Sequence, residues 1–255
     1  MLVAGKRIIV TGGLTGVGRA SAVKLAREGA KVVTISRQAP DCEAARKVGE
    51  TSGVVAHIRC DVSNQAEVNR AFDEAVEMLG GLDGMVGAAG IGKDKPTEEL
   101  TADDFLEMYS INVLGTHFTD LAAFRHMKGQ RSGSIVNFSS VSGLLGRPNQ
   151  AHYCASRGAV LAYTRAVARE WGPFGIRVNS IAPAAKSEAY YEWEKVLPED
   201  ERRRELARRK EQFPLRGDMG TPDDSANVAL WLVSDLSSYV TGQVVPVDGG
   251  LVMTR

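Results

Sequence analysis

The feature that most constrains this chain is a glycine-rich turn between a strand-like run and a helical pattern near the N-terminus. The turn reads Thr-Gly-Gly-Leu-Thr-Gly-Val-Gly and follows the apolar run Arg7–Thr11 directly. A strand, a tight turn and a helix in this order bring backbone N–H groups to a helix N-terminus, where the helix dipole favours a phosphate. Side chains would block a pyrophosphate, so Gly12, Gly16 and Gly18 are predicted to leave room for it. We expect a nucleotide-binding loop, a purely structural turn being the weaker alternative.

The alternation of strand-like and helical segments continues along the whole chain. Seven short apolar runs predict strands buried on both faces. They are Arg7–Thr11, Lys31–Ser36, Val54–Cys60, Gly84–Ala88, Ser134–Phe138, Ile176–Ile181 and Gln243–Val247. The segments with helical spacing are Gly16–Glu28, Asp41–Glu50, Gln65–Leu79, Ala102–Met127, Ala151–Trp171 and Pro222–Ser234. This order predicts a Rossmann-like, three-layer α/β/α fold with a doubly wound parallel sheet of about seven strands.

Composition bounds the domain count and excludes several functional classes. The 255 residues suit one large domain, and no repeat or linker marks a second one, so residues 1–255 are expected to form a single unit. A formal net charge of +0 offers no broad basic surface for nucleic acid. The three cysteines show no CxxC spacing, which predicts neither disulfides nor a metal site and fits a reducing cytoplasm. No run approaches the ~18 apolar residues of a membrane span.

One long segment departs from the alternation. Ala185–Phe213 is highly charged and lies between the sixth predicted strand and the last predicted helix. Insertions at that end of an open α/β sheet bind ligands, so the segment is predicted to form a substrate lid of one or two exposed helices. Its arginines alternate with glutamates, which is typical of a solvated helix. Recognition of an acidic substrate or carrier is the alternative for these basic residues.

Several ordered motifs resemble those of classical short-chain dehydrogenases/reductases. The first turn resembles the family's TGxxxGxG motif, and Asp61 resembles the acidic residue that holds adenine. The other matching segments are Gly87–Gly90, Asn112, Ile135–Ser140, Tyr153, Tyr239–Gly242 and Val247–Gly250. The resemblance covers essentially the whole chain. It implies an enzyme that moves a hydride between a nicotinamide cofactor and a small alcohol, ketone or aldehyde, and that assembles as a homotetramer or homodimer.

By this resemblance, four residues form the catalytic group. Ser140 hydrogen-bonds the substrate oxygen, Tyr153 is the general acid/base, and Asn112 positions a water. Tyr153 and Arg157 are four residues apart on a predicted helix and share one face. The family has lysine where this chain has Arg157. A guanidinium keeps the positive charge that favours an ionised phenol, but it cannot release a proton.

The substitution at position 157 leaves three interpretations open. The protein could be an active reductase in which Arg157 acts electrostatically, a slow and specialised enzyme, or a regulatory protein that binds cofactor without turnover. Retention of Ser140, Tyr153 and Asn112 favours an enzyme. A reductase of carrier-bound 3-oxoacyl groups is a further alternative within enzymes.

The end of the second predicted strand bears on the choice of cofactor. A carboxylate there would bind the adenosine ribose and select NAD, but this chain has Ser36 and Arg37. A guanidinium can bind a 2′-phosphate, so NADP(H) is predicted, with NAD(H) possible if Arg37 is only a surface residue. The residues predicted to contact the cofactor are Gly12, Thr15, Gly16, Val17, Gly18, Ser36, Arg37, Asp61, Val62, Ala89, Gly90, Tyr153, Arg157, Pro183 and Ser187.

Overall fold

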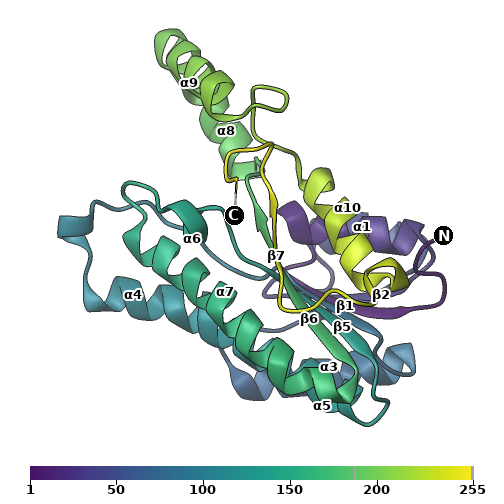
Figure 1. Cartoon of the computed structure of the whole chain (residues 1–255). Helices are drawn as coiled ribbons and strands as arrows, with labels where there is room; N and C mark the ends of the chain where they lie inside the picture. Colours follow the sequence, from purple (N-terminus) through teal and green to yellow (C-terminus); the bar gives the residue numbers. More distant parts are fainter. Residues whose placement is uncertain (187, 254–255) are drawn as a thin grey trace.

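A seven-stranded, entirely parallel sheet forms the centre of the structure, a computed structural model that describes residues 1–186 and 188–253 (Figure 1). The strands are β1 (Arg7–Thr11), β2 (Lys31–Ser36), β3 (Val54–Arg59), β4 (Gly84–Gly87), β5 (Gly133–Phe138), β6 (Ile176–Pro183) and β7 (Val244–Val247). Their order is β3-β2-β1-β4-β5-β6-β7, so the direction of strand addition reverses between β1 and β4. The predicted Rossmann-like fold is confirmed, because a doubly wound sheet has this reversal at its ligand-binding crevice.

Helices cover both faces of the sheet. The helices are α1 (Gly16–Arg27), α2 (Glu43–Gly49), α3 (Gln65–Leu79), α4 (Ala102–Tyr109), α5 (Gly115–Lys128), α6 (Ser142–Leu145), α7 (Ala151–Trp171), α8 (Glu188–Val196), α9 (Glu199–Gln212) and α10 (Pro222–Val233). Short 3₁₀ turns lie at Thr97–Glu99, Gly172–Phe174 and Asp235–Ser237. Helices α1 and α10 pack together on one face, while α3, α5 and α7 cover the other (Figure 1).

Alternating side chains of the central strands supply the two cores. Ile8 and Val10 pack with the layer of α1 and α10, and Ile9 between them packs with the opposite layer. All three side chains have no exposed surface. Burial of one such side chain contributes about 1.5–3 kcal/mol. The sheet is therefore fixed on both faces, which holds the ends of its strands in place for a binding site.

The segment predicted as one helix over Ala102–Met127 is interrupted, so that prediction was wrong in detail. Helix α4 ends at Tyr109, a π-helical turn spans Ser110–Leu114, and α5 begins at Gly115. A π-helical turn inserts one extra residue into a helix without breaking its path, and such turns are frequent at functional sites. Here the turn contains Asn112, whose side chain is fully buried.

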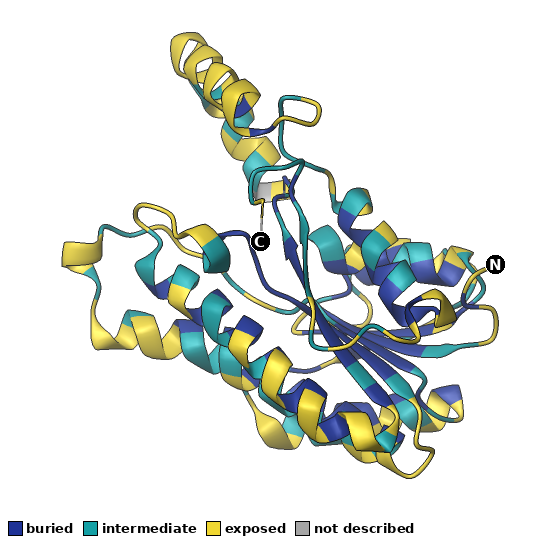
Figure 2. Cartoon of the chain, viewed as in Figure 1, coloured by how far each residue is buried: buried dark blue, intermediate teal, exposed yellow. Residues whose placement is uncertain are grey.

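The predicted lid forms two helices, α8 and α9, that project beyond the carboxyl end of β6 (Figure 1). Most of α9 is exposed (Figure 2), as its alternating charges predict. An ionic cluster around the buried Lys186 and Arg209 ties the two helices to the segment that follows them. Lys186 lies 2.7 Å from Asp218, and Arg209 lies 2.9 Å from the same carboxylate and also pairs with Glu194. None of the described helices is long and apolar enough to cross a membrane.

Candidate active site

The loops that follow β1, β4, β5 and β6 meet at the carboxyl edge of the sheet. Because parallel strands end at the same edge, the glycine-rich turn and the segment after β4 come together there. They share a cavity of about 220 Å³. Its lining residues are Gly12, Thr15, Gly16, Val17, Gly18, Ala88, Ala89, Gly90, Ala185, Lys186 and Pro222. The sequence predicted seven of these as cofactor contacts, and the fold brings them together.

The N-terminus of α1 already binds an anionic group of the chain itself. The backbone N–H of Gly16 donates to the Glu188 carboxylate at 3.1 Å, and Arg19 donates to the same group at 2.8 Å. Gly12 has a φ of +65°, and a Cβ there would lie 2.8 Å from the Ala89 nitrogen. The backbone can therefore make this turn only with glycine. A turn that holds a carboxylate on the Gly16 N–H and the Arg19 guanidinium also fits a pyrophosphate.

The residues predicted to bind the adenosine lie at the ends of β2 and β3. Ser36 is buried and its hydroxyl donates to Gln38 at 2.6 Å, whereas Arg37 is exposed. Asp61 follows β3, and its carboxylate accepts from the Ser63 hydroxyl at 2.8 Å. Although burial opposes it, the hydrogen bonds from Ser63 and the charge of Arg37 hold the pKa of Asp61 below its usual value. Val62 beside it is buried. None of these four residues lines the cavity at the glycine-rich turn, so their contact with the cofactor stays a prediction.

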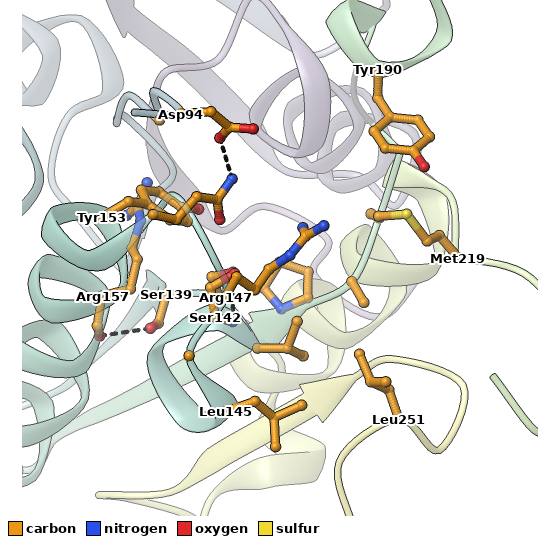
Figure 3. A pocket seen from close by; sticks show the side chains of 18 of the residues that line it. Asp94, Ser139, Ser142, Leu145, Arg147, Tyr153, Arg157, Tyr190, Met219 and Leu251 are labelled. Atoms are coloured by element: carbon orange, nitrogen blue, oxygen red, sulfur yellow. Dashed lines mark hydrogen bonds between the residues drawn. The ribbon is translucent and has the colours of Figure 1, made fainter. Parts of the chain in front are cut away.

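A larger cavity of about 560 Å³ adjoins the glycine-rich turn and is lined by three of the four predicted catalytic residues (Figure 3). Ser140, Tyr153, Arg157 and Pro183 all line it. The Ser140 hydroxyl is almost fully buried and accepts a hydrogen bond from the Ser142 nitrogen at 3.1 Å. The cavity is thus a place where a carbonyl oxygen could meet a hydroxyl and a phenol at once. Ser187, also predicted here, lies outside the described residues.

Arg157 lies directly against the Tyr153 ring. Its guanidinium carbon is 5.2 Å from the ring centroid, which is a cation–π distance, and its Nη1 donates to the Phe138 carbonyl at 3.1 Å. The side chain is 7% exposed, and its Nε has no hydrogen-bond partner in the described part of the chain. A Cβ at Gly90 would collide with Nη2 of Arg157, so glycine leaves the space that the guanidinium needs.

Asn112 connects two segments of the site, the loop after β4 and helix α7, through its side chain. Its amide nitrogen donates to the Ile91 carbonyl at 2.9 Å and to the Ser156 hydroxyl at 3.0 Å. The backbone nitrogen of Ile91 donates back to the side-chain oxygen Oδ1 of Asn112 at 2.9 Å. The π-helical turn therefore joins the loop after β4 to α7, the helix that carries Tyr153. Asn112 is not among the residues that line the larger cavity.

Comparison with known proteins identifies the family. A family model described as enoyl-(acyl carrier protein) reductase matches residues 12–252. The 3-oxoacyl-[acyl-carrier-protein] reductase of Aquifex aeolicus is 35% identical over 249 residues, which cover 97% of each chain. The levodione reductase of Leifsonia aquatica is 38% identical over 95% of this chain and 92% of its own. The 2-(S)-hydroxypropyl-CoM dehydrogenase 3 of Xanthobacter autotrophicus is 36% identical over 96% of this chain and 95% of its own.

The chain belongs to the short-chain dehydrogenase/reductase family. It is an NAD(P)-dependent oxidoreductase, and the prediction of the family and of an enzyme is confirmed. The names of the three relatives differ in substrate. Membership of the family therefore identifies the type of reaction, and the substrate has to be inferred from the residues that line the cavity.

This short-chain dehydrogenase/reductase also carries a buried acid that the sequence analysis missed. The Asn137 amide donates to Asp120 Oδ2 at 2.7 Å, between β5 and α5. Complete burial raises the pKa of Asp120 to about 8, although the Asn137 hydrogen bond lowers it. The other side-chain oxygens of the pair, Asp120 Oδ1 and Asn137 Oδ1, have no hydrogen-bond partner in the described part of the chain, because two acceptors cannot bond each other. A proton on Asp120 would supply a donor for Asn137 Oδ1, which gives a neutral acid–amide pair. A single aspartate in a helical pattern carries no signal of this pairing.

Proposed function

We propose that the protein interconverts an alcohol and a ketone or aldehyde with NADP(H), using Tyr153 as general acid/base and Arg157 in place of the family's lysine. One observation carries the proposal. A phenol, a hydroxyl and a buried guanidinium surround one cavity that adjoins a turn able to hold a pyrophosphate. The cofactor and the carbonyl substrate can therefore bind next to each other.

The side chains have separate tasks in this reaction. Ser140 donates a hydrogen bond to the carbonyl oxygen and orients it. The nicotinamide, when bound, supplies a hydride to the carbonyl carbon in reduction or accepts it in oxidation. Tyr153 gives its proton to the oxygen in reduction and removes it in oxidation. Arg157 stabilises the ionised phenol by its charge and donates to the ribose hydroxyls. Asn112 holds α7 and the loop after β4 in register and is proposed to place a water near the phenol.

The cofactor is held by the turn and by the ends of β2, β3 and β6. Gly12, Thr15, Gly16, Val17 and Gly18 take the pyrophosphate. The remaining proposed contacts are Ser36, Arg37, Asp61, Val62, Ala89, Gly90, Pro183 and Ser187. NADP(H) is favoured because the exposed Arg37 guanidinium is available for a 2′-phosphate, and residues 36–38 contain no carboxylate that would repel one.

Initial rates with NADPH and NADH over a panel of ketones test this function. We expect kcat/KM to favour NADPH, and Arg37→Glu to lower kcat/KM for NADPH by about 10- to 100-fold, since charge-assisted hydrogen bonds contribute about 1.5–3 kcal/mol. Arg27→Glu makes the same charge change on exposed surface at the far end of α1 and serves as the matched control. A preference for NADH that Arg37→Glu leaves unaltered would refute the NADP(H) assignment.

A further inference from the structure

The larger cavity is lined by more cationic than anionic side chains. The lining guanidinium groups are Arg147, Arg157, Arg208 and Arg209, and the lining carboxylates are Asp94 and Glu205. The pairing of each cation decides whether it is available to a ligand, because a guanidinium bound to a carboxylate is already compensated. The four arginines differ sharply in this respect.

The two arginines of the lid are compensated within the lid itself. Arg209 is 1% exposed and is surrounded by the carboxylates of Glu194, Asp218 and Glu205. Arg208 donates to Glu205 at 2.7 and 2.9 Å. These groups hold the lid together, so an anionic ligand would have to displace a carboxylate to reach either guanidinium.

Arg147 has no such partner. It lies on the loop between α6 and α7, and in the part of the chain that the structure describes no carboxylate lies within ion-pair distance of it. Arg157 also has no carboxylate partner among the described residues, but its guanidinium lies against the Tyr153 ring and donates to the Phe138 carbonyl. The Asp94 carboxylate accepts a hydrogen bond from Gln150 at 2.5 Å. Figure 3 shows the Arg147 side chain reaching into the middle of the cavity, between Tyr153 on one side and Met219 on the other. The cation therefore faces the space that a substrate would occupy.

The rest of the cavity suits a small ligand with an apolar body. The apolar side chains of Leu145, Phe213, Met219 and Leu251 belong to its lining. Figure 3 shows Met219 and Leu251 on the side away from Tyr153. A volume of about 560 Å³ admits a small organic molecule, and a few polar groups placed among apolar ones fix its orientation. Ser140 and Tyr153 provide polar groups on one side of the cavity, and the exposed Arg147 guanidinium provides a separate, charged one.

We propose that the substrate is a small ketone, or the matching alcohol, that carries a carboxylate or sulfonate, and that Arg147 binds this anionic group while the carbonyl lies at Ser140 and Tyr153. The inference rests on the proposed function, because it assigns the substrate class of the same site. A planar guanidinium binds such groups through two hydrogen bonds.

The observations favour a small anion over an acidic carrier protein. Arg147 is exposed but lines the same cavity as Ser140 and Tyr153, whereas a carrier would dock on the outside of the lid. On α9, Arg202 pairs with Glu199, and Arg204 pairs with Asp200 at 2.8 Å, whereas the exposed Arg203 makes no ion pair in the described part of the chain. The two pairs reduce the positive charge that this solvated helix could offer to a carrier.

The test compares 5-oxohexanoate with 5-oxohexanamide, which is similar in shape and uncharged. We expect wild-type kcat/KM to favour the carboxylate by about 10- to 100-fold, mostly through KM. Arg147→Ala should bring this ratio close to one, and Arg147→Lys should restore part of it. Arg203→Ala removes an exposed lid arginine that does not line the cavity, and it should leave the ratio at its wild-type value.

Calorimetric binding of 5-oxohexanoate in the presence of NADP⁺ separates this inference from the proposed function. Binding that Arg147→Ala weakens, without any turnover, would refute the redox function and support the anion site. Equal reduction of the two ketones, or a carboxylate preference that survives Arg147→Ala, would overturn the anion site. Reduction of a carrier-bound thioester with no Arg147-dependent binding of the free acid would overturn it as well.

Discussion

A guanidinium in the place of an ammonium changes what the residue at position 157 can do. Lysine is a compact charge on a flexible stem, whereas Arg157 is planar, stacks on the Tyr153 ring and anchors itself on the Phe138 carbonyl. Its position requires the empty space above Gly90. Local geometry therefore supports Arg157 as an integrated part of the site, acting through its fixed charge.

Removing the positive charge at position 157 should lower kcat more than replacing the guanidinium by an ammonium. We expect Arg157→Met to lower kcat by about 100-fold or more, because general acid–base catalysis contributes about 10²–10⁴-fold and depends on the ionised phenol. Arg157→Lys should keep activity within about tenfold of wild type. The measurement is kcat for NADPH-dependent ketone reduction. A gain of several orders of magnitude in Arg157→Lys would mean that the arginine impairs the site.

The protonation of Asp120 should appear in the pH dependence of stability. Its folded pKa of about 8 lies above the ordinary value of 3.8, so the folded state holds a proton that the unfolded state has lost in this range. This contribution is fully present below pH 3.8 and is lost as the pH rises through 8. Stability should fall by at most about 1.4 kcal/mol per pH unit.

Asp120→Asn isolates this effect, since an amide can make the same two hydrogen bonds without a titrating proton. Urea unfolding at pH 5 and pH 8 should show a larger loss of stability in wild type than in Asp120→Asn. The same pH dependence in both proteins would contradict a neutral acid–amide pair.

At the scale of elements, α8 is held against α1 by the Glu188 carboxylate. That carboxylate lies on the Gly16 N–H, where the cofactor pyrophosphate is proposed to bind. Two anions repel each other there, so Glu188 must leave when the cofactor enters.

Neutralising this carboxylate should tighten cofactor binding. We expect Glu188→Gln to lower the Kd for NADPH about two- to tenfold, because competition at the N-terminus of α1 becomes weaker. Titration of the protein followed by NADPH fluorescence measures this Kd. Glu192→Gln, an exposed change on the same helix, should leave Kd unaltered. Weaker binding by Glu188→Gln would show that the carboxylate assists the cofactor.

The elements themselves were largely predictable, and the exceptions have physical causes. Strands buried on both faces give apolar runs, so their positions were predicted to within two residues. The π-helical turn at Ser110–Leu114 was missed because its side chains keep helical spacing on both sides. The short α6 was missed because Ser142–Leu145 is too short for a periodic pattern. The contact of Glu188 with α1 joins residues 172 positions apart, which periodicity cannot reveal.

At the scale of the whole molecule, motif order predicted the architecture and the meeting of Ser140, Tyr153 and Arg157 at one cavity. The substrate could not be predicted in the same way. Arg147 became a candidate only when folding placed it at that cavity with no carboxylate partner among the described residues. Assembly as a homotetramer or homodimer stays a prediction that sedimentation can check.

Turnover by Tyr153→Phe tests the central claim most directly. The substitution removes one hydroxyl and leaves the ring against Arg157. We predict that NADPH still binds, as its fluorescence will show, and that kcat for ketone reduction falls by about 10²–10⁴-fold. Reduction at the wild-type rate by this variant would contradict the account, because the proton would then come from another group.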